Sequence, residues 1–200
     1  MKNKSFHRME LEKKIKEIFP KLNGVILDIG SKNRSYDFLF KEKPIAIDLI
    51  ENKEMDVLKG DINNLNFESE SFQSVVCLEV LEYISTPKKA VDEIYRILKT
   101  DGEVVLSTPF MLKVHNDKMR YTEECLIEIF SNFKSCKIHY IGNFYTIILD
   151  ILRKKIIDIK FIPLKYLSAV LFLPLLIFLP LSRFSKDRNF VSGYLVVAKK

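Results

Sequence analysis

The sequence predicts an α/β domain built on a doubly wound, mostly parallel sheet. The first observation is a set of continuous apolar runs bounded by glycine or proline, such as GVILDIG at residues 24–30, which is typical of strands buried on both faces. The second is that segments with helical spacing separate these runs. Alternation of strands and helices predicts parallel strands joined by right-handed crossovers, with ligands bound at the carboxyl ends of the strands.

The elements follow in order along the chain. An amphipathic helix is expected within residues 1–22, because apolar residues recur at helical spacing and Pro20 ends the run. A second helix begins at Thr86 and stops before Gly102, and a third opens on Thr122 with acidic residues in its first turn. Strands are expected at residues 24–30, 44–50, within 57–65, at 74–78, 103–110, 136–142 and 194–199.

Composition favours one globular domain in a reducing compartment. The chain has 200 residues, of which 48% are hydrophobic and 29% charged. Its 3 cysteines are widely spaced and include no CxxC pair, so neither a disulfide framework nor a metal site is indicated. The N-terminal stretch is charged throughout and lacks the apolar region of a signal peptide. We therefore expect a cytoplasmic setting.

Positive charge is concentrated at the C-terminal end. The net charge of the chain is +6. Residues 143–200 include ten Lys and Arg but only three Asp, which gives +7, whereas residues 1–142 carry −1. The near-neutral first part argues against nucleic acid as a partner. A segment that is both basic and apolar suits the anionic surface of a membrane better.

The same C-terminal part contains a hydrophobic segment at residues 161–184. Its centre, Tyr166–Ser182, has seventeen residues without a charge, which is at the lower limit for a membrane-spanning helix, and prolines interrupt it. Both flanks are basic. We expect residues 143–189 to form a helical insertion before the last strand, lying on or dipping into the inner leaflet with a bend at Pro174. The alternative is a buried helical pair that forms a dimer interface or covers the sheet.

Several motifs occur in a characteristic order. They are LDIGSKNRSY, IAIDL, KGDINNLNFESESFQSVVCLEVLEYI and RILKTDGEVVLSTPF. Together they resemble the class I S-adenosylmethionine-dependent methyltransferases of the small methyltransferase-domain type, over about residues 23–142 and the last strand. The resemblance implies a Rossmann-like, mostly parallel seven-stranded sheet and S-adenosyl-L-methionine as the cofactor.

The resemblance also implies roles for individual residues. Gly30 would allow the backbone to approach the methionine part of the cofactor, and Asp48 would accept the ribose hydroxyls. Asp61 and Ile62 would contact the adenine ring. A turn glycine and solvated charges at strand ends are the structural alternatives. The full set expected to bind the cofactor is Asp28, Gly30, Ser31, Asp48, Leu49, Asp61, Ile62, Leu78 and Glu79.

The sequence departs from the family pattern in two places, the loop after Gly30 and position 83. Lys32 and Arg34 stand where further glycines are usual, and positive side chains beside a sulfonium are unfavourable unless they point away or pair with acids. Asn33 tolerates left-handed backbone angles and is expected to help the loop keep its shape. Tyr83 stands where the family commonly has histidine, and a tyrosine hydroxyl is a poor base at neutral pH.

Catalytic candidates come from the loop after the fifth strand. There His115 is placed to deprotonate an acceptor hydroxyl, and Arg120 to hold a phosphate or carboxylate of the substrate; Tyr121 completes the set. The alternative for His115 is an ordinary surface residue. No role is expected for His7 or His139.

The expected function is methyl transfer, most readily to an oxygen, on a small or lipid-linked acceptor such as an envelope glycan precursor or a lipid, at the inner face of the membrane. One alternative is a non-catalytic protein of the same fold that serves as the membrane-docked partner of another enzyme. Another is a nicotinamide-dependent oxidoreductase, which ranks lower because its fingerprint requires three glycines and only Gly30 is present.

Overall fold

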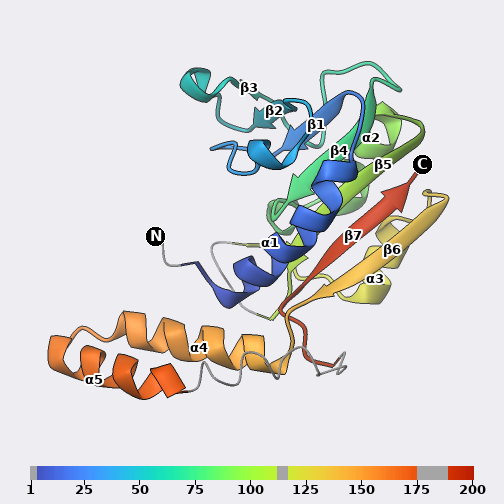
Figure 1. Cartoon of the computed structure of the whole chain (residues 1–200). Helices are drawn as coiled ribbons and strands as arrows, with labels where there is room; N and C mark the ends of the chain where they lie inside the picture. Colours follow the sequence, from blue (N-terminus) through green and yellow to red (C-terminus); the bar gives the residue numbers. More distant parts are fainter. Residues whose placement is uncertain (1–3, 112–116, 175–188) are drawn as a thin grey trace.

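A seven-stranded sheet forms the centre of the molecule, in the order β3-β2-β1-β4-β5-β7-β6 (Figure 1). This computed structural model describes residues 4–111, 117–174 and 189–200. Every pairing is parallel except those of β7, which runs antiparallel to both of its neighbours. The predicted mostly parallel, doubly wound sheet is thus confirmed. The strands are β1 (Ile26–Ile29), β2 (Ile45–Asp48), β3 (Val57–Lys59), β4 (Phe72–Leu78), β5 (Leu98–Pro109), β6 (Ser135–Ile141) and β7 (Gly193–Lys199).

The strand order reverses beside β1. From β1 the chain adds β2 and β3 on one side, and it then returns to place β4 on the other side. Such a reversal leaves a crevice beyond the carboxyl ends of the two central strands, since the connections leave in opposite directions. Here those ends are Ile29 of β1 and Leu78 of β4.

Helices cover both faces of the sheet. Alternation along β4 divides its side chains: Val75 and Cys77 pack with α2 (Pro87–Ile97) and α3 (Glu123–Ile129), whereas Val76 packs with α1 (Phe6–Ile18). Burial on both faces explains why the strands appear as continuous apolar runs in the sequence. Short 3-10 turns occupy residues 19–21, 37–39, 53–55 and 81–83.

The N-terminus of α1 is held by a residue distant in the sequence. Ser5 caps the helix by accepting from the Arg8 amide at 3.1 Å. The buried carboxylate of Asp150 accepts from the amides of Phe6 and His7 at 2.9 and 2.8 Å. Asp150 lies on α4, so α1 is tied to the segment that follows β6.

Helices α4 (Phe144–Asp158) and α5 (Ile162–Phe172) form a hairpin that extends beyond the sheet (Figure 1). α4 begins directly after β6, whose last residue pairs with Gly193 of β7, which in turn pairs with Pro109 at the end of β5. The hairpin therefore starts at the edge of the sheet where β5 has its carboxyl end. Its exposed large apolar residues are Phe144, Ile148, Ile151, Ile157, Phe161, Ile162, Leu164, Tyr166, Leu167, Val170 and Leu171. Within the described ranges, no helix combines the length and apolar character needed to cross a bilayer.

Candidate functional site

Two cavities meet at the crevice where the strand order reverses. The Asp48 cavity, of about 510 Å³, lies over the ends of β1, β2 and β3. The α1 cavity, of about 610 Å³, lies between α1 and the loop at residues 31–39. Ile29, Gly30 and Lys32 line both cavities, so the two spaces adjoin across the end of β1.

All nine residues predicted to bind the cofactor line these cavities. The loops that follow three adjacent parallel strands end at the same edge of the sheet, which brings distant residues together. The Asp48 cavity receives Gly30, Asp48, Leu49, Asp61, Ile62 and Glu79. The α1 cavity receives Asp28, Gly30, Ser31 and Leu78.

Gly30 is required by the fold itself. Its φ is +79°, and a Cβ at this position would lie 2.3 Å from Cγ2 of Val80. The amides of Gly30 and Ser31 both donate to the Ile47 carbonyl, at 2.8 and 3.2 Å, which fastens the turn to β2. Close packing against Val80 is therefore a reason for this glycine that the sequence did not reveal.

The loop after Gly30 is stabilised by Arg34. Its buried guanidinium forms an ion pair with Asp37 at 2.7 Å and donates to the carbonyls of Asp56 and Pro44 at 2.7 and 2.8 Å. Arg34 also takes the left-handed backbone conformation, with φ of 48°, so the expectation that placed Asn33 in this role is wrong. The paired charge of Arg34 supports the loop, whereas the exposed Lys32 faces both cavities.

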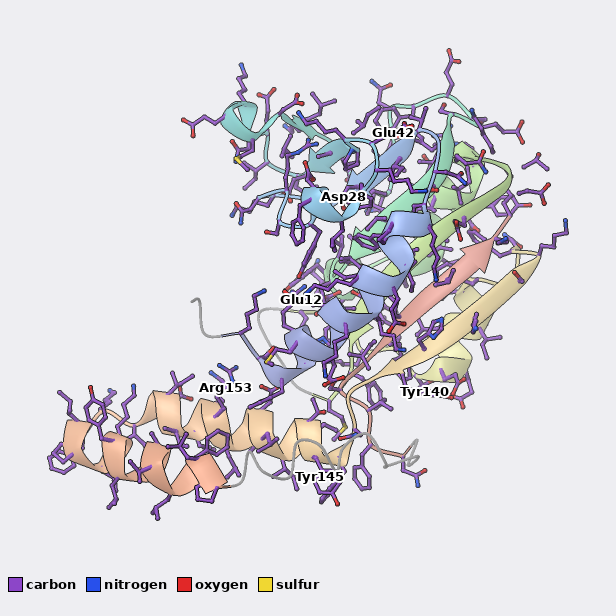
Figure 2. The ribbon with its side chains drawn as sticks, viewed as in Figure 1. Glu12, Asp28, Glu42, Tyr140, Tyr145 and Arg153 are labelled. Atoms are coloured by element: carbon purple, nitrogen blue, oxygen red, sulfur yellow. The ribbon has the colours of Figure 1, made fainter. Side chains whose placement is uncertain are left out.

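Asp28 is a buried carboxyl group facing the α1 cavity. Burial raises its pKa from 3.8 to about 7, and nearby Asp37 acts in the same direction, while the Ser31 hydroxyl favours the ionised form. Figure 2 shows Asp28 on β1 above Glu12 of α1. A cation bound beside Asp28 would restore its ionised state, which makes the position suited to the positively charged part of a ligand.

Asp48 and Asp61 line the Asp48 cavity at the ends of β2 and β3. Oδ1 of the half-buried Asp48 accepts from the Ile50 amide at 3.2 Å. Oδ1 of Asp61 accepts from the backbone and side-chain nitrogens of Asn63 at 2.9 and 3.1 Å, forming an Asx turn. Ile62 is buried and offers the apolar part of the wall.

Glu79 belongs to a buried polar cluster that the sequence did not predict. Oε2 of Glu79 lies 3.4 Å from Nε2 of His7, and Oε1 accepts from the Ser107 hydroxyl at 3.1 Å. Nδ1 of His7 lies 2.8 Å from Oγ of Ser192, which itself donates to the Ile141 carbonyl, so His7 Nδ1 is the donor. His7, for which the sequence indicated no role, thus contacts a residue that was predicted to bind the cofactor.

The electrostatics of this cluster keep Glu79 ionised. Burial opposes ionisation, but His7, Arg8 and Ser107 outweigh it and the pKa of Glu79 is lowered. Its φ of 56° is an uncommon value for a side-chain-bearing residue, and such strain concentrates at functional sites. His7 fits because Gly193 has no side chain: a Cβ there would lie 2.7 Å from Cε1 of His7.

Glu82 and Tyr83 follow in the 3-10 turn after β4. Burial, and secondly the charge of Glu79, raise the pKa of Glu82 to about 8, and its Oε2 has no hydrogen-bond partner among the described residues. Tyr83 lines the Asp48 cavity, and burial raises its pKa further above the neutral range. The tyrosine is thus a poor proton acceptor at this position.

The three predicted catalytic residues have different placements. His115 lies outside the described residues. Arg120 forms an ion pair with Asp117. Tyr121 is buried, its hydroxyl donates to the Leu81 carbonyl at 2.9 Å, and burial raises its pKa to about 12. Neither Arg120 nor Tyr121 is among the described residues that line the two cavities, and the contacts of Tyr121 give it a structural role.

A seven-stranded sheet of this order, with an acid at the end of β2 and a cavity at the switch point, defines a Rossmann-like domain built to hold a nucleoside. A family model described as a methyltransferase domain matches residues 27–106. This match, over 80 of the 200 residues, supports a place among the class I S-adenosylmethionine-dependent methyltransferases, whose cofactor is S-adenosyl-L-methionine.

The chain is similar to several known proteins in sequence or in fold. The mitochondrial ubiquinone biosynthesis O-methyltransferase of Dictyostelium discoideum is 36% identical over 61 residues, which are 30% of this chain and only 19% of that relative. A SAM-dependent methyltransferase of Thermotoga maritima, described as a possible histamine N-methyltransferase, has a TM-score of 0.63 at 15% identity, covering 98% of this chain and 91% of the other. Haemonchus contortus phosphoethanolamine N-methyltransferase 2, in complex with S-adenosyl-L-methionine, has a TM-score of 0.59 at 18% identity. The match covers 96% of this chain and 52% of the other.

The residues present fit this cofactor. S-adenosylmethionine carries an ammonium and a sulfonium, and the buried Asp28 gains from a neighbouring cation. Its ribose offers two hydroxyls to a carboxylate such as Asp48, and its adenine offers an apolar face to Ile62. It contains no pyrophosphate, so the glycine-rich cradle of dinucleotide enzymes is not required.

Proposed function

We propose that this protein transfers the methyl group of S-adenosylmethionine to an oxygen of a small or lipid-linked acceptor at the inner surface of a membrane. The observation that carries the proposal is that nine residues, selected from the sequence for cofactor binding, line two adjoining cavities at the switch point. Asp48 is assigned to the ribose and Asp28 to the cationic end of the methionine arm. The α1 cavity is lined by Asp28 and adjoins the Asp48 cavity at Gly30.

The reaction needs positioning more than elaborate acid–base chemistry. When bound, S-adenosylmethionine would supply a methyl group on a sulfonium, with a neutral thioether as the leaving group. Holding the two reactants in line accounts for much of the rate enhancement of such displacements. The acceptor hydroxyl must also lose its proton, and His115 is retained as the proposed base because it follows β5 in the sequence and β5 ends at this edge of the sheet.

The hairpin supports a lipid-linked acceptor. Its many exposed apolar residues accompany Arg153, Lys154, Lys155, Lys160 and Lys165, and it starts at the sheet edge where the cavities open. An apolar surface with basic neighbours suits an anionic leaflet. A methyltransferase held there would reach acceptors that are anchored in lipid.

A non-catalytic membrane-docked partner is the second candidate. Lys32 faces both cavities, and Tyr83 replaces the histidine of the family pattern. Under this alternative the fold persists without turnover.

Calorimetric titration with S-adenosylmethionine and S-adenosylhomocysteine tests the proposal. We expect micromolar binding that Asp48→Ala abolishes, whereas the matched control Glu51→Ala, an exposed acid outside both cavity linings, leaves it unchanged. A lipid extract supplied with methyl-labelled S-adenosylmethionine then reports transfer. A folded protein that binds neither ligand would favour the non-catalytic candidate.

A further inference from the structure

The α1 cavity has a charge pattern that the cofactor does not account for. Its cations are Lys4, Arg8, Lys16, Lys32 and Arg34, and its acids are Glu12 and Asp28. Two of the cations are neutralised within the fold: Arg34 pairs with Asp37, and Lys4 pairs with Glu12 at 2.7 Å.

Three cations of this cavity form no ion pair within the part of the chain that the structure describes. Arg8 donates to the Tyr36 hydroxyl at 3.3 Å, and among the described residues neither Arg8, Lys16 nor Lys32 forms an ion pair with a carboxylate. Arg8 and Lys16 lie two helical turns apart on one face of α1, and Lys32 approaches from the loop that forms the opposite wall. Positive charge therefore surrounds the cavity from two elements.

The cofactor offers a single carboxylate to these three cations. One carboxylate balances one of the three charges, even where it pairs bidentately with Arg8, which leaves two unmatched positive charges beside the bound sulfonium. A second ligand with about two negative charges would balance the remainder, and a phosphate group carries about −1.5 to −2 at neutral pH. The exposed ring of Phe38, with Leu39 and Leu78, supplies an apolar wall for the rest of such a ligand.

We propose that the α1 cavity is the acceptor site and that it selects an acceptor bearing a phosphate or diphosphate, which Lys16 and Lys32 bind from opposite walls. The inference rests on the proposed methyl transfer and specifies the chemical class of its substrate. The phosphate could belong to a lipid headgroup or to a soluble ester, since both present the same anion to these side chains.

The test is calorimetric titration of inorganic pyrophosphate into the full-length protein saturated with S-adenosylhomocysteine. We expect a ternary complex, and Lys16→Ala combined with Lys32→Ala should weaken pyrophosphate binding roughly tenfold through the loss of two ion contacts. The matched control is Lys13→Ala, on the same helix but paired with Glu10 at 2.5 Å and outside the cavity lining. It should change the affinity less than about twofold.

Three outcomes would overturn the acceptor site: no pyrophosphate binding, competition between pyrophosphate and S-adenosylhomocysteine, or equal weakening in the control. A protein that fails to bind S-adenosylhomocysteine would instead contradict the proposed function. Pyrophosphate titrated into the cofactor-free protein would then still decide whether the cations form an anion site. Comparing glycerol 3-phosphate with short-chain phosphatidic acid distinguishes a soluble from a lipid source, because only the latter gains affinity from its chains.

Discussion

Burial of the Asp28 carboxyl group destabilises the folded protein when this group is ionised. The same buried group is the one that we propose to bind the cationic part of the cofactor. Its pKa is raised from 3.8 to about 7 by burial, so the folded protein retains a proton that the unfolded chain has already lost between these values. In this pH range the folded state binds more protons than the unfolded chain, so the free energy of unfolding falls as pH rises. A ligand cation beside Asp28 would offset that cost.

We therefore predict that Asp28→Asn stabilises the cofactor-free protein, and that this gain grows by about 2 to 3 kcal/mol between pH 5 and pH 8. Urea unfolding at the two pH values measures it. Glu82, with a pKa of about 8, titrates in both proteins, so its contribution to the free energy of unfolding cancels when the two proteins are compared. The same variant should bind S-adenosylhomocysteine at least about tenfold more weakly, since it loses the carboxylate that we propose to bind the ammonium of this ligand. A variant that is no more stable at pH 8 would contradict the buried-carboxyl account.

At the scale of elements, the contacts of the loop after β1 bear on whether Lys32 and Arg34 indicate a loss of cofactor binding. Arg34 fixes the loop by one ion pair and two carbonyl contacts, so this departure from the glycine pattern serves the fold. Restoring glycine at position 34 should lower the free energy of unfolding by about 2 kcal/mol, even though glycine tolerates the φ of 48°.

The matched comparison is Lys32→Gly, at an exposed position of the same loop, which should change the free energy of unfolding by less than about 1 kcal/mol. Denaturant titration of both variants gives the two values. Equal losses would show that the contacts of Arg34 contribute little. A gain in cofactor affinity for either variant would favour decay of the loop over adaptation.

The sequence predicted elements better than the contacts between them. Strands such as β4 were predictable because burial on both faces produces an unbroken apolar run. Likewise Asp48 and Asp61 were predictable because they follow parallel strands, whose ends must share an edge. The pairing of His7 with Glu79 was not, because it joins residues 72 positions apart through the packing of α1 on the sheet. The one local signal was Gly193, whose missing side chain makes room for the His7 ring.

At the scale of the whole molecule, helix α1 contacts the hairpin at its N-terminus and also lines the α1 cavity. Asp150 of α4 binds the first amides of α1, and the same helix supplies Arg8 and Lys16 to the α1 cavity. The ring of Phe6 also lies 6.5 Å from that of Phe172 on α5. A surface that holds the hairpin would therefore also fix the wall of the proposed acceptor site.

The membrane hypothesis is tested with substitutions on the exposed face of the hairpin. Leu167 and Leu171 are 57% and 67% exposed, so Leu167→Glu with Leu171→Glu should leave the fold intact while placing two negative charges against the leaflet. We predict that the wild-type protein co-floats with vesicles containing phosphatidylglycerol and that this double variant does not. Ile127→Glu on α3, at a position 52% exposed, is the matched control and should float like the wild type. If the wild type instead stays in the soluble fraction and the double variant converts a dimer to a monomer in size-exclusion chromatography, the apolar face is an interface between copies of this chain. The acceptor would then have to reach the cavities from solution.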